Sequence, residues 1–190
     1  MAKKVTLTDI QNALTPDYIR VSQIIYFSII MGVSVFFLII VFMYLQGTAE
    51  ETATEEAIAS VNRFSLIHGA LFAASLFLSG FLYNGFLGEH RIESMTGGAG
   101  HDDGASVASG YLAAIRTAKI IRIAIIEAAV FFGLVTCFMA VTSRVLYQNP
   151  YYWANALSYV IFVVMLLRDF PSREKMTELF RGKLKFLLQY

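Results

Sequence analysis

Long apolar runs separated by short polar segments dominate the chain. Four of them lie at residues 24–45, 64–87, about 120–141 and about 151–167. Each is close to the length of about 20 residues that a helix needs to cross a bilayer. Within lipid the runs must be helical, because an open strand would leave its backbone groups without hydrogen bonds. The pattern therefore predicts an all-α membrane protein with a bundle of four transmembrane helices over residues 24–167.

The polar N-terminal arm, residues 1–23, contains a helix start. Thr15 is followed by Pro16, and a threonine cap with proline at the first helical position is a common beginning of a helix. We therefore expect a helix that starts in the arm and leads into the first span.

The C-terminal segment, residues 168–190, predicts one further helix. Pro171 ends the fourth span, because proline cannot continue a helix, and Ser172 is placed to cap the next one. The apolar residues that follow have helical spacing, with Lys and Arg on the other side; they are Met176, Leu179, Phe180, Leu184, Leu187 and Leu188. This pattern predicts a basic amphipathic helix that lies on anionic lipid or docks on a partner.

The loop between the second and third spans, residues 88–119, contains the string SMTGGAGHDDGASVASG at residues 94–110. Its Gly, Ser and Ala content predicts a flexible linker, with the third helix starting near Tyr111. A phosphate-binding loop is excluded, because no Gly-Lys-Ser or Gly-Lys-Thr ends the string.

Composition and charge support a membrane location. The chain is 57% hydrophobic and only 15% charged, whereas about a quarter of the residues of a soluble domain are charged. Thirteen of the 15 basic residues lie in the two tails and in the loop between spans two and three with its flanks, and the exceptions are Arg63 and Arg144. The positive-inside rule then places both termini in the cytoplasm and the protein in the inner (plasma) membrane. The net charge of +1 gives no indication of nucleic-acid binding.

Glu127 is the most informative polar residue of the predicted spans. It lies roughly 10 Å inside the third span, where a carboxylate costs a few kcal/mol and normally faces protein or water. The candidate partners at similar depth or at span ends are Tyr26, Ser28, Tyr83, Asn84, Arg122 and Arg168. Two interpretations stay open: a buried acid that supports helix packing, and a site that exchanges a proton or cation.

The three histidines and the lone cysteine do not assemble a catalytic or redox centre in the sequence. His68 lies near the outer end of the second span, in the opposite half from Glu127, while His90 and His101 lie in the inner loop. His101 with Asp102 and Asp103 has metal-binding side chains, but a flexible loop holds ligands poorly. We therefore expect no enzyme activity, no cofactor and no metal.

Small residues recur on the second and third spans and permit close helix contacts. The candidates are Gly69, Ala70, Ala74, Gly80, Ala129 and Gly133. They predict tight packing between these two spans, or contacts with other membrane subunits or a second copy of the chain.

The string EAAVFFGLV, Glu127 to Val135, resembles the ion-carrying helix of the proteolipid ring subunit of rotary ATP synthases. Glu127, Ala128, Phe132 and Gly133 occupy positions that match that helix, as do the two residues that follow. The resemblance implies proton or cation exchange at Glu127. The partner span lacks the glycine series of that family, and the inner loop is long.

A longer stretch resembles small four-helix membrane proteins of bacteria that are uncharacterised. It comprises TAKIIRIAIIEAAVFFGLV, a short outer loop, the fourth span and FPSREKMTELF. This resemblance implies a location and a fold and no particular activity. The leading hypothesis is a non-enzymatic structural or accessory subunit of a membrane assembly, and the alternative is a proton- or cation-handling protein.

Overall fold

The computed structural model describes residues 5–47, 52–88, 104–182 and 184–188. Within them the chain is helical, apart from turns and one isolated parallel bridge between Val5 and Leu188. It forms two compact units. Unit 1 comprises Met1–Tyr26, Ser79–Ile123 and Phe170–Tyr190, and unit 2 comprises Phe27–Leu78 and Ala124–Asp169.

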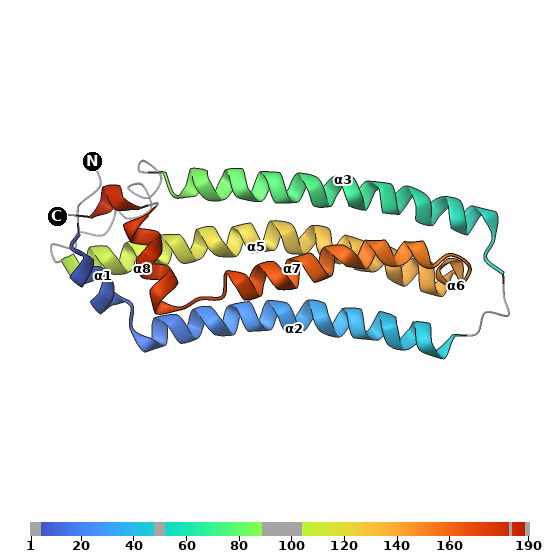
Figure 1. Ribbon diagram of the computed structural model, residues 1–190, viewed down its shortest axis with the longest axis horizontal. Helices are drawn as coiled ribbons and strands as arrows, with labels where there is room; N and C mark the ends of the chain where they lie inside the picture. The colour runs from blue at the N-terminus through green and yellow to red at the C-terminus, as the bar shows by residue number, and fades with distance from the viewer. Residues whose placement is uncertain (1–4, 48–51, 89–103, 183, 189–190) are drawn as a thin grey trace. The chain divides into compact units, whose positions relative to one another are not determined.

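Helices account for nearly all of the described residues (Figure 1). In chain order they are α1 (Leu7–Ala13), α2 (Pro16–Gln46), α3 (Glu55–Phe86), α5 (Gly104–Thr142), α6 (Val145–Gln148), the 3-10 helix η1 (Pro150–Ala156), α7 (Leu157–Arg168), α8 (Arg173–Arg181) and the 3-10 helix η2 (Lys185–Leu187). Four helical segments are long and apolar enough to cross a membrane: Pro16–Gln46, Glu55–Phe86, Ser106–Thr142 and Pro150–Arg168. They confirm the four predicted spans, and the first three extend well beyond the predicted N-terminal bounds.

The N-terminal arm is helical from its first described residues. The predicted start of α2 at Pro16 is confirmed, and Tyr18 N donates to the Thr15 hydroxyl over 3.2 Å. The short helix α1 before it was not predicted. Its cap is reciprocal, since Asp9 N donates to the Thr6 hydroxyl over 3.1 Å and Thr6 N donates to the Asp9 carboxylate over 2.9 Å. Such a capping box satisfies backbone groups that a helix start leaves open.

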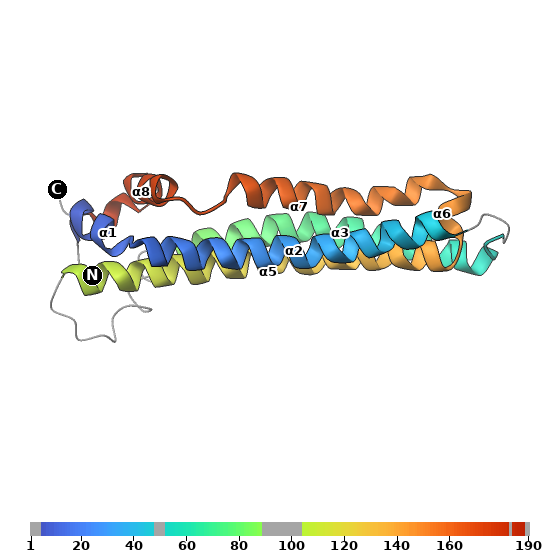
Figure 2. The ribbon, with the colours of Figure 1, turned by 90° about the horizontal axis from the view of Figure 1, so that it is seen from below.

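The linker predicted at residues 94–110 is partly wrong, because α5 begins at Gly104 (Figure 2). Ala108, Tyr111 and Leu112 are at most 1% exposed and belong to the core of unit 1. Tertiary burial of this face outweighs the weak helix propensity of a Gly- and Ser-rich segment. Residues 94–103 of the predicted linker, with His101, Asp102 and Asp103, lie outside the described residues, as does His90.

The last helix begins as predicted, with Lys175 N donating to the Ser172 hydroxyl over 3.3 Å. It ends earlier than predicted, at Arg181, and a short 3-10 turn follows. The apolar side chains assigned to lipid or a partner are instead mostly in the core of unit 1: Met176, Phe180, Leu184, Leu187 and Leu188 are buried, and Leu179 packs against them. The chain itself supplies the surface on which this segment docks.

Unit 1 contains a cluster of buried apolar side chains. Its buried side chains come from α1, the end of α3, the start of α5 and the C-terminal segment; among them are Ile10, Leu14, Tyr83, Leu87, Ile115 and Phe180. The backbone ties the two ends of the chain together, since Val5 N donates to Leu187 O over 3.0 Å. The polar N-terminal arm is therefore part of this core.

Unit 2 has the opposite arrangement of polar and apolar side chains. Large apolar residues on the outside of its helices are exposed, as Phe42, Leu66, Phe77 and Val164 illustrate. Inside, its buried residues include polar ones: His68, Ser75, Thr136, Asn155 and Ser158. An apolar exterior around a hydrogen-bonded interior is the arrangement that hydrocarbon favours.

Aromatic contacts join α2 to the last span within unit 2. The rings of Phe37 and Tyr159 stack with centroids 4.6 Å apart, and the Tyr159 hydroxyl lies 3.0 Å from the hydroxyl of Ser34. At the end of α2, the Tyr147 hydroxyl donates to the carbonyl oxygen of Tyr44 over 2.9 Å. This bond satisfies one of the backbone acceptors that the last turn of a helix leaves open.

Candidate functional site

The most elaborate polar arrangement of the described residues is a ladder of hydrogen bonds between α3 and the η1–α7 segment in unit 2. Three residues of α3, each three positions apart, pair with three residues of η1–α7 that have the same spacing. The pairs are Asn62 with Tyr152 (2.8 Å), Ser65 with Asn155 (2.9 Å) and His68 with Ser158 (3.1 Å). The constant offset shows that the two segments run parallel and in register along this edge.

Asn155 orients the imidazole of His68. Its amide nitrogen donates to the Ser65 hydroxyl over 2.9 Å and to Tyr152 O over 3.0 Å, so its carbonyl oxygen Oδ1 faces the ring. His68 Nδ1 lies 3.0 Å from that oxygen, which can only accept, and Nδ1 therefore carries the hydrogen. In the neutral ring, Nε2 then presents a lone pair toward Ser158.

The hydroxyl of Ser158 has two acceptors within reach. It lies 3.1 Å from His68 Nε2 and 3.0 Å from the carbonyl oxygen of Asn155. When Nε2 is unprotonated the hydroxyl can donate to it, and when Nε2 carries a hydrogen the hydroxyl can accept and donate to the carbonyl instead. Both protonation states of His68 therefore keep a complete set of hydrogen bonds.

Gly133 of α5 makes room for this imidazole. A Cβ at this position would overlap His68 and lie 2.8 Å from the carbonyl oxygen of Asn155. Three segments thus meet here without a side chain between them, which is the close approach that small residues permit in membranes. Nearby on α5, the buried thiol of Cys137 donates weakly to Tyr152 O over 3.6 Å.

The atoms around His68 have the connectivity of a hydrolase triad, with a hydroxyl at Nε2 and an oriented group at Nδ1. The sequence did not predict this arrangement. Ser158 is only 2% exposed, and its hydroxyl shares its hydrogen with a backbone carbonyl of its own helical segment. The geometry therefore supports packing of three helices better than nucleophilic attack.

An open cleft of about 450 Å³ runs along the ladder in unit 2. Asn62, Ser65 and Asn149 line one part of it, and Phe72 and Ile161 line another. Among the described residues that line it, none is Asp, Glu, Lys or Arg. The cleft can therefore recognise a ligand by hydrogen bonds and apolar contacts, without a fixed charge.

The sequence pattern pointed to His68 and Gly133 but not to Asn62, Ser65, Asn155 and Ser158. A signal was present, because polar residues recur at every third position in both segments, which places them on one helix face. The meeting of the two faces could not be predicted, since it depends on which helices are neighbours.

Glu127 lies in unit 2, half-buried and well away from the ends of α5. Among the described residues of that unit, no side chain forms a hydrogen bond or ion pair with its carboxyl group. The exposed Arg168 belongs to the same unit and has interactions of its own. No bond joins Arg168 to Glu127 among the described residues, and the role of Glu127 as a site stays a prediction.

Of the other candidate partners of Glu127, Ser28 lies in unit 2, and the remaining four lie in unit 1. Two of them contact each other, since the Arg122 guanidinium lies over the ring of Tyr83 at 5.3 Å. Tyr83 is buried at 7% exposed, whereas Asn84 on the next position is exposed. Tyr26 is buried in the same unit, and its ring meets Phe170 edge-on at 6.2 Å.

The small residues that were predicted to pack the second and third spans together differ in their exposure. Ala129 and Gly133 of α5 are buried, whereas Gly69, Ala70 and Ala74 of α3 are exposed. A Cβ added at Gly69 or Gly80 would meet no heavy atom within 4 Å. On α3 the predicted packing residues are thus available to another molecule.

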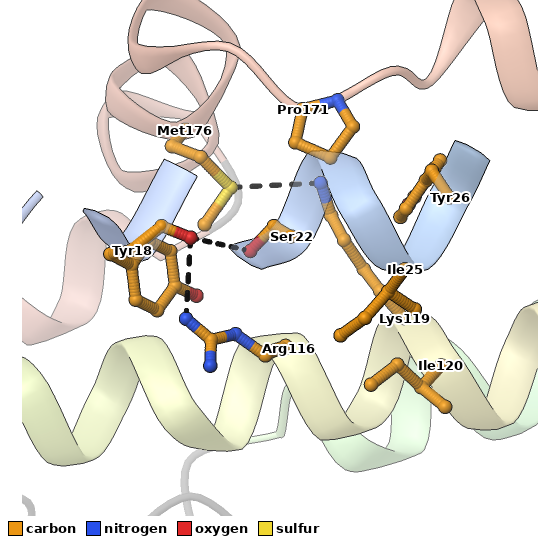
Figure 3. A pocket seen from close by; sticks show the side chains of 9 residues that line it. All are labelled: Tyr18, Ser22, Ile25, Tyr26, Arg116, Lys119, Ile120, Pro171 and Met176. Atoms are coloured by element: carbon orange, nitrogen blue, oxygen red, sulfur yellow. Dashed lines mark hydrogen bonds between the residues drawn. The ribbon is translucent and has the colours of Figure 1, made fainter. Parts of the chain in front are cut away.

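Unit 1 contains a small pocket next to two basic residues of α5 (Figure 3). The Arg116 guanidinium lies 4.0 Å from the centroid of the Tyr18 ring, and its Nη2 donates to Tyr18 O over 3.4 Å. Its buried Nε–H has no acceptor among the described residues. Lys119 extends along the pocket to the sulfur of Met176 at 3.6 Å. The free volume of about 20 Å³ suits one water molecule.

No group of three or more metal-binding side chains occurs among the described residues. Comparison of the chain with family models, with curated proteins and with solved structures finds no match. The fold and the distribution of side chains define the class: this is an integral membrane protein with four spans that contacts the lipid bilayer.

Proposed function

We propose that the chain is a non-enzymatic membrane protein that acts as a structural or accessory subunit and associates with a neighbour through the outer face of α3. The supporting observation is a set of exposed small residues on that face: Ala70, Ala73 and Ala74. They lie between two large side chains, Leu66 at 77% exposed and Phe77 at 81% exposed.

The helical positions place these five residues on one side of α3. His68, Phe72 and Ser75 occupy the opposite side, with His68 and Ser75 buried. Small residues between two large ones leave a shallow trough into which side chains of another helix fit closely. Lipid alone does not require such a trough, so a second transmembrane helix is the expected occupant.

Extraction in a mild detergent tests the association. Ala70→Leu and Ala74→Leu would fill the trough while leaving the fold intact, because both side chains are exposed. We expect the wild-type protein to copurify with a partner or a second copy, and the double variant to lose it. Ala128→Leu, an exposed alanine of α5, is the matched control and should retain the partner. Equal association of all three proteins would contradict the proposal.

We propose further that both termini face the cytoplasm of an inner membrane, on the basis of the distribution of basic residues. Reporter fusions after Gln46 and after Tyr190 should then report opposite sides. Both reporters on one side would contradict the four-span map, and a Tyr190 reporter outside the cytoplasm would contradict this orientation.

Proton or cation exchange at Glu127 is the second candidate function. It is supported by the half-buried carboxyl in the interior of a span and the absence of a bonded side chain among the described residues of unit 2. Glu127→Gln should then keep the fold and abolish ion flux in proteoliposomes, because an amide cannot exchange a proton. A carbodiimide that modifies protonated carboxyl groups in lipid should label Glu127. If there is neither flux nor labelling at any pH, this candidate is wrong.

A further inference from the structure

The cleft along the ladder of unit 2 changes in character from one end to the other. Asn62 lies near the start of α3, and Phe72 lies ten residues further, about 15 Å along the helix. On the facing segment, Asn149 precedes η1 and Ile161 follows in α7. Hydrogen-bonding side chains therefore line one end of the cleft, and apolar side chains line the other.

The polar end offers hydrogen-bond donors. Asn62 Oδ1 accepts from the Tyr152 hydroxyl, Ser65 Oγ accepts from Asn155, and Asn149 Oδ1 accepts from Tyr151 N. The hydroxyl hydrogen of Ser65 and the side-chain N–H groups of Asn62 and Asn149 have no acceptor among the described residues. A ligand that satisfies them must bring acceptor oxygens.

A formal charge on the ligand would have no counterpart here. Among the described lining residues His68 is the one that can become cationic, and its two ring nitrogens already face Asn155 and Ser158. An anionic or cationic group that enters the cleft would find no opposite charge among these residues to offset the water it loses. Uncharged acceptor oxygens fit the cleft better.

We infer that this cleft binds an uncharged, membrane-dissolved amphiphile whose polar end carries carbonyl oxygens. The carbonyl oxygens accept from Asn62, Ser65 and Asn149, and the apolar tail lies against Phe72 and Ile161. A volume of about 450 Å³ is within the range of small-molecule pockets. The chemistry is shared by diacylglycerols and isoprenoid quinones, and the ligand enters from the bilayer.

Photo-crosslinking in lipid nanodiscs tests this inference. Three probes carry the same diazirine in an apolar chain: a diacylglycerol, a quinone, and a phosphatidylglycerol with an anionic head. We expect one of the two uncharged probes to label the peptides around Phe72 and Ile161 about tenfold more than the anionic probe. A tenfold ratio of labelling corresponds to the free energy of one or two hydrogen bonds, or to the cost of burying a charge. The uncharged probe that labels the protein then identifies the source of the ligand.

A matched pair of glycine variants tests the location. Gly69 lines the cleft, and a Cβ there meets no heavy atom within 4 Å. Gly69→Leu should therefore fill the cleft without strain and reduce labelling to the level of the anionic probe. Gly32, on α2, has equally open surroundings and does not line the cleft, so Gly32→Leu should label like the wild-type protein.

Competition provides a readout that does not depend on a variant. An excess of the same uncharged lipid without the diazirine should suppress the labelling, whereas an excess of phosphatidylglycerol should not. Equal labelling by all three probes, labelling that neither uncharged competitor suppresses, or unchanged labelling of Gly69→Leu would each overturn the inference.

Discussion

The two units of this protein distribute polar and apolar side chains in opposite ways. In unit 1 the buried side chains are almost entirely apolar, and the charged residues of α8 such as Arg173 and Lys175 are exposed. In unit 2 the exterior is apolar and a hydrogen-bonded ladder that includes His68 and Asn155 lies inside. We interpret this difference as the effect of two solvents: water stabilises burial of apolar surface, whereas in lipid, packing and internal hydrogen bonds take over.

The largest contrast is expected for buried and exposed phenylalanines. Phe180 is fully buried in unit 1, and Phe180→Ala should cost about 3–5 kcal/mol through lost burial and a cavity. Phe42 of unit 2 is 59% exposed, and Phe42→Ala should cost much less, because the ring already faces lipid. Equilibrium unfolding in detergent micelles measures both variants. Equal losses would contradict the assignment of two solvents.

Two glycine substitutions should change stability in opposite directions. At Gly133 a Cβ would overlap the His68 ring, so Gly133→Ala should destabilise the protein by about 1–3 kcal/mol. At Gly32 the surroundings are open, so Gly32→Ala should stabilise α2 by about 0.5–1 kcal/mol through helix propensity. Thermal unfolding of the two variants in the same detergent gives the comparison. A stabilising Gly133→Ala would show that the three segments do not meet closely there.

The interior hydrogen bonds of unit 2 should contribute more than those on its surface. Asn155→Leu removes the acceptor at His68 Nδ1 and leaves that donor buried, which should cost about 1–3 kcal/mol. Thr142 is exposed and bonds only to carbonyl oxygens of its own helix, so Thr142→Val should change stability by less than about 0.5 kcal/mol. The free energy of unfolding in detergent measures both effects, and similar values would contradict a structural role for the ladder.

The smallest effect is expected at the start of α1 in unit 1. The hydrogen bonds from the Thr6 hydroxyl and backbone N–H lower the pKa of the Asp9 carboxyl group below its usual value. Their contribution to helix stability is therefore present above the unfolded pKa of about 4 and is lost as the pH falls through the lowered folded pKa. Thr6→Val should reduce the local stability of α1 near neutral pH, because it removes the hydroxyl that caps the helix.

Hydrogen exchange of the α1 amides as a function of pH measures this effect. The wild-type protein should lose protection at acid pH, and Thr6→Val should have lower protection with a weaker dependence on pH. An unchanged pH dependence in Thr6→Val would show that the Thr6–Asp9 bonds do not stabilise the helix.

Local sequence determined the features of this protein that depend on local energetics. The four spans follow from the length and polarity of each apolar run, because transfer of a helix into lipid is a sum over its own residues. The helix starts at Pro16 and after Ser172 were equally predictable, since a cap involves residues three or four positions apart.

Tertiary structure alone decided which side chains are buried and which segments they contact. The start of α5 at Gly104 and the burial of Leu184 and Leu187 depend on a core assembled from four separate segments, and no local pattern contains that information. The meeting of His68, Gly133 and Asn155 likewise depends on which helices are neighbours. A hydrogen bond or close contact between residues far apart in the chain is determined only when the helices that carry them have packed.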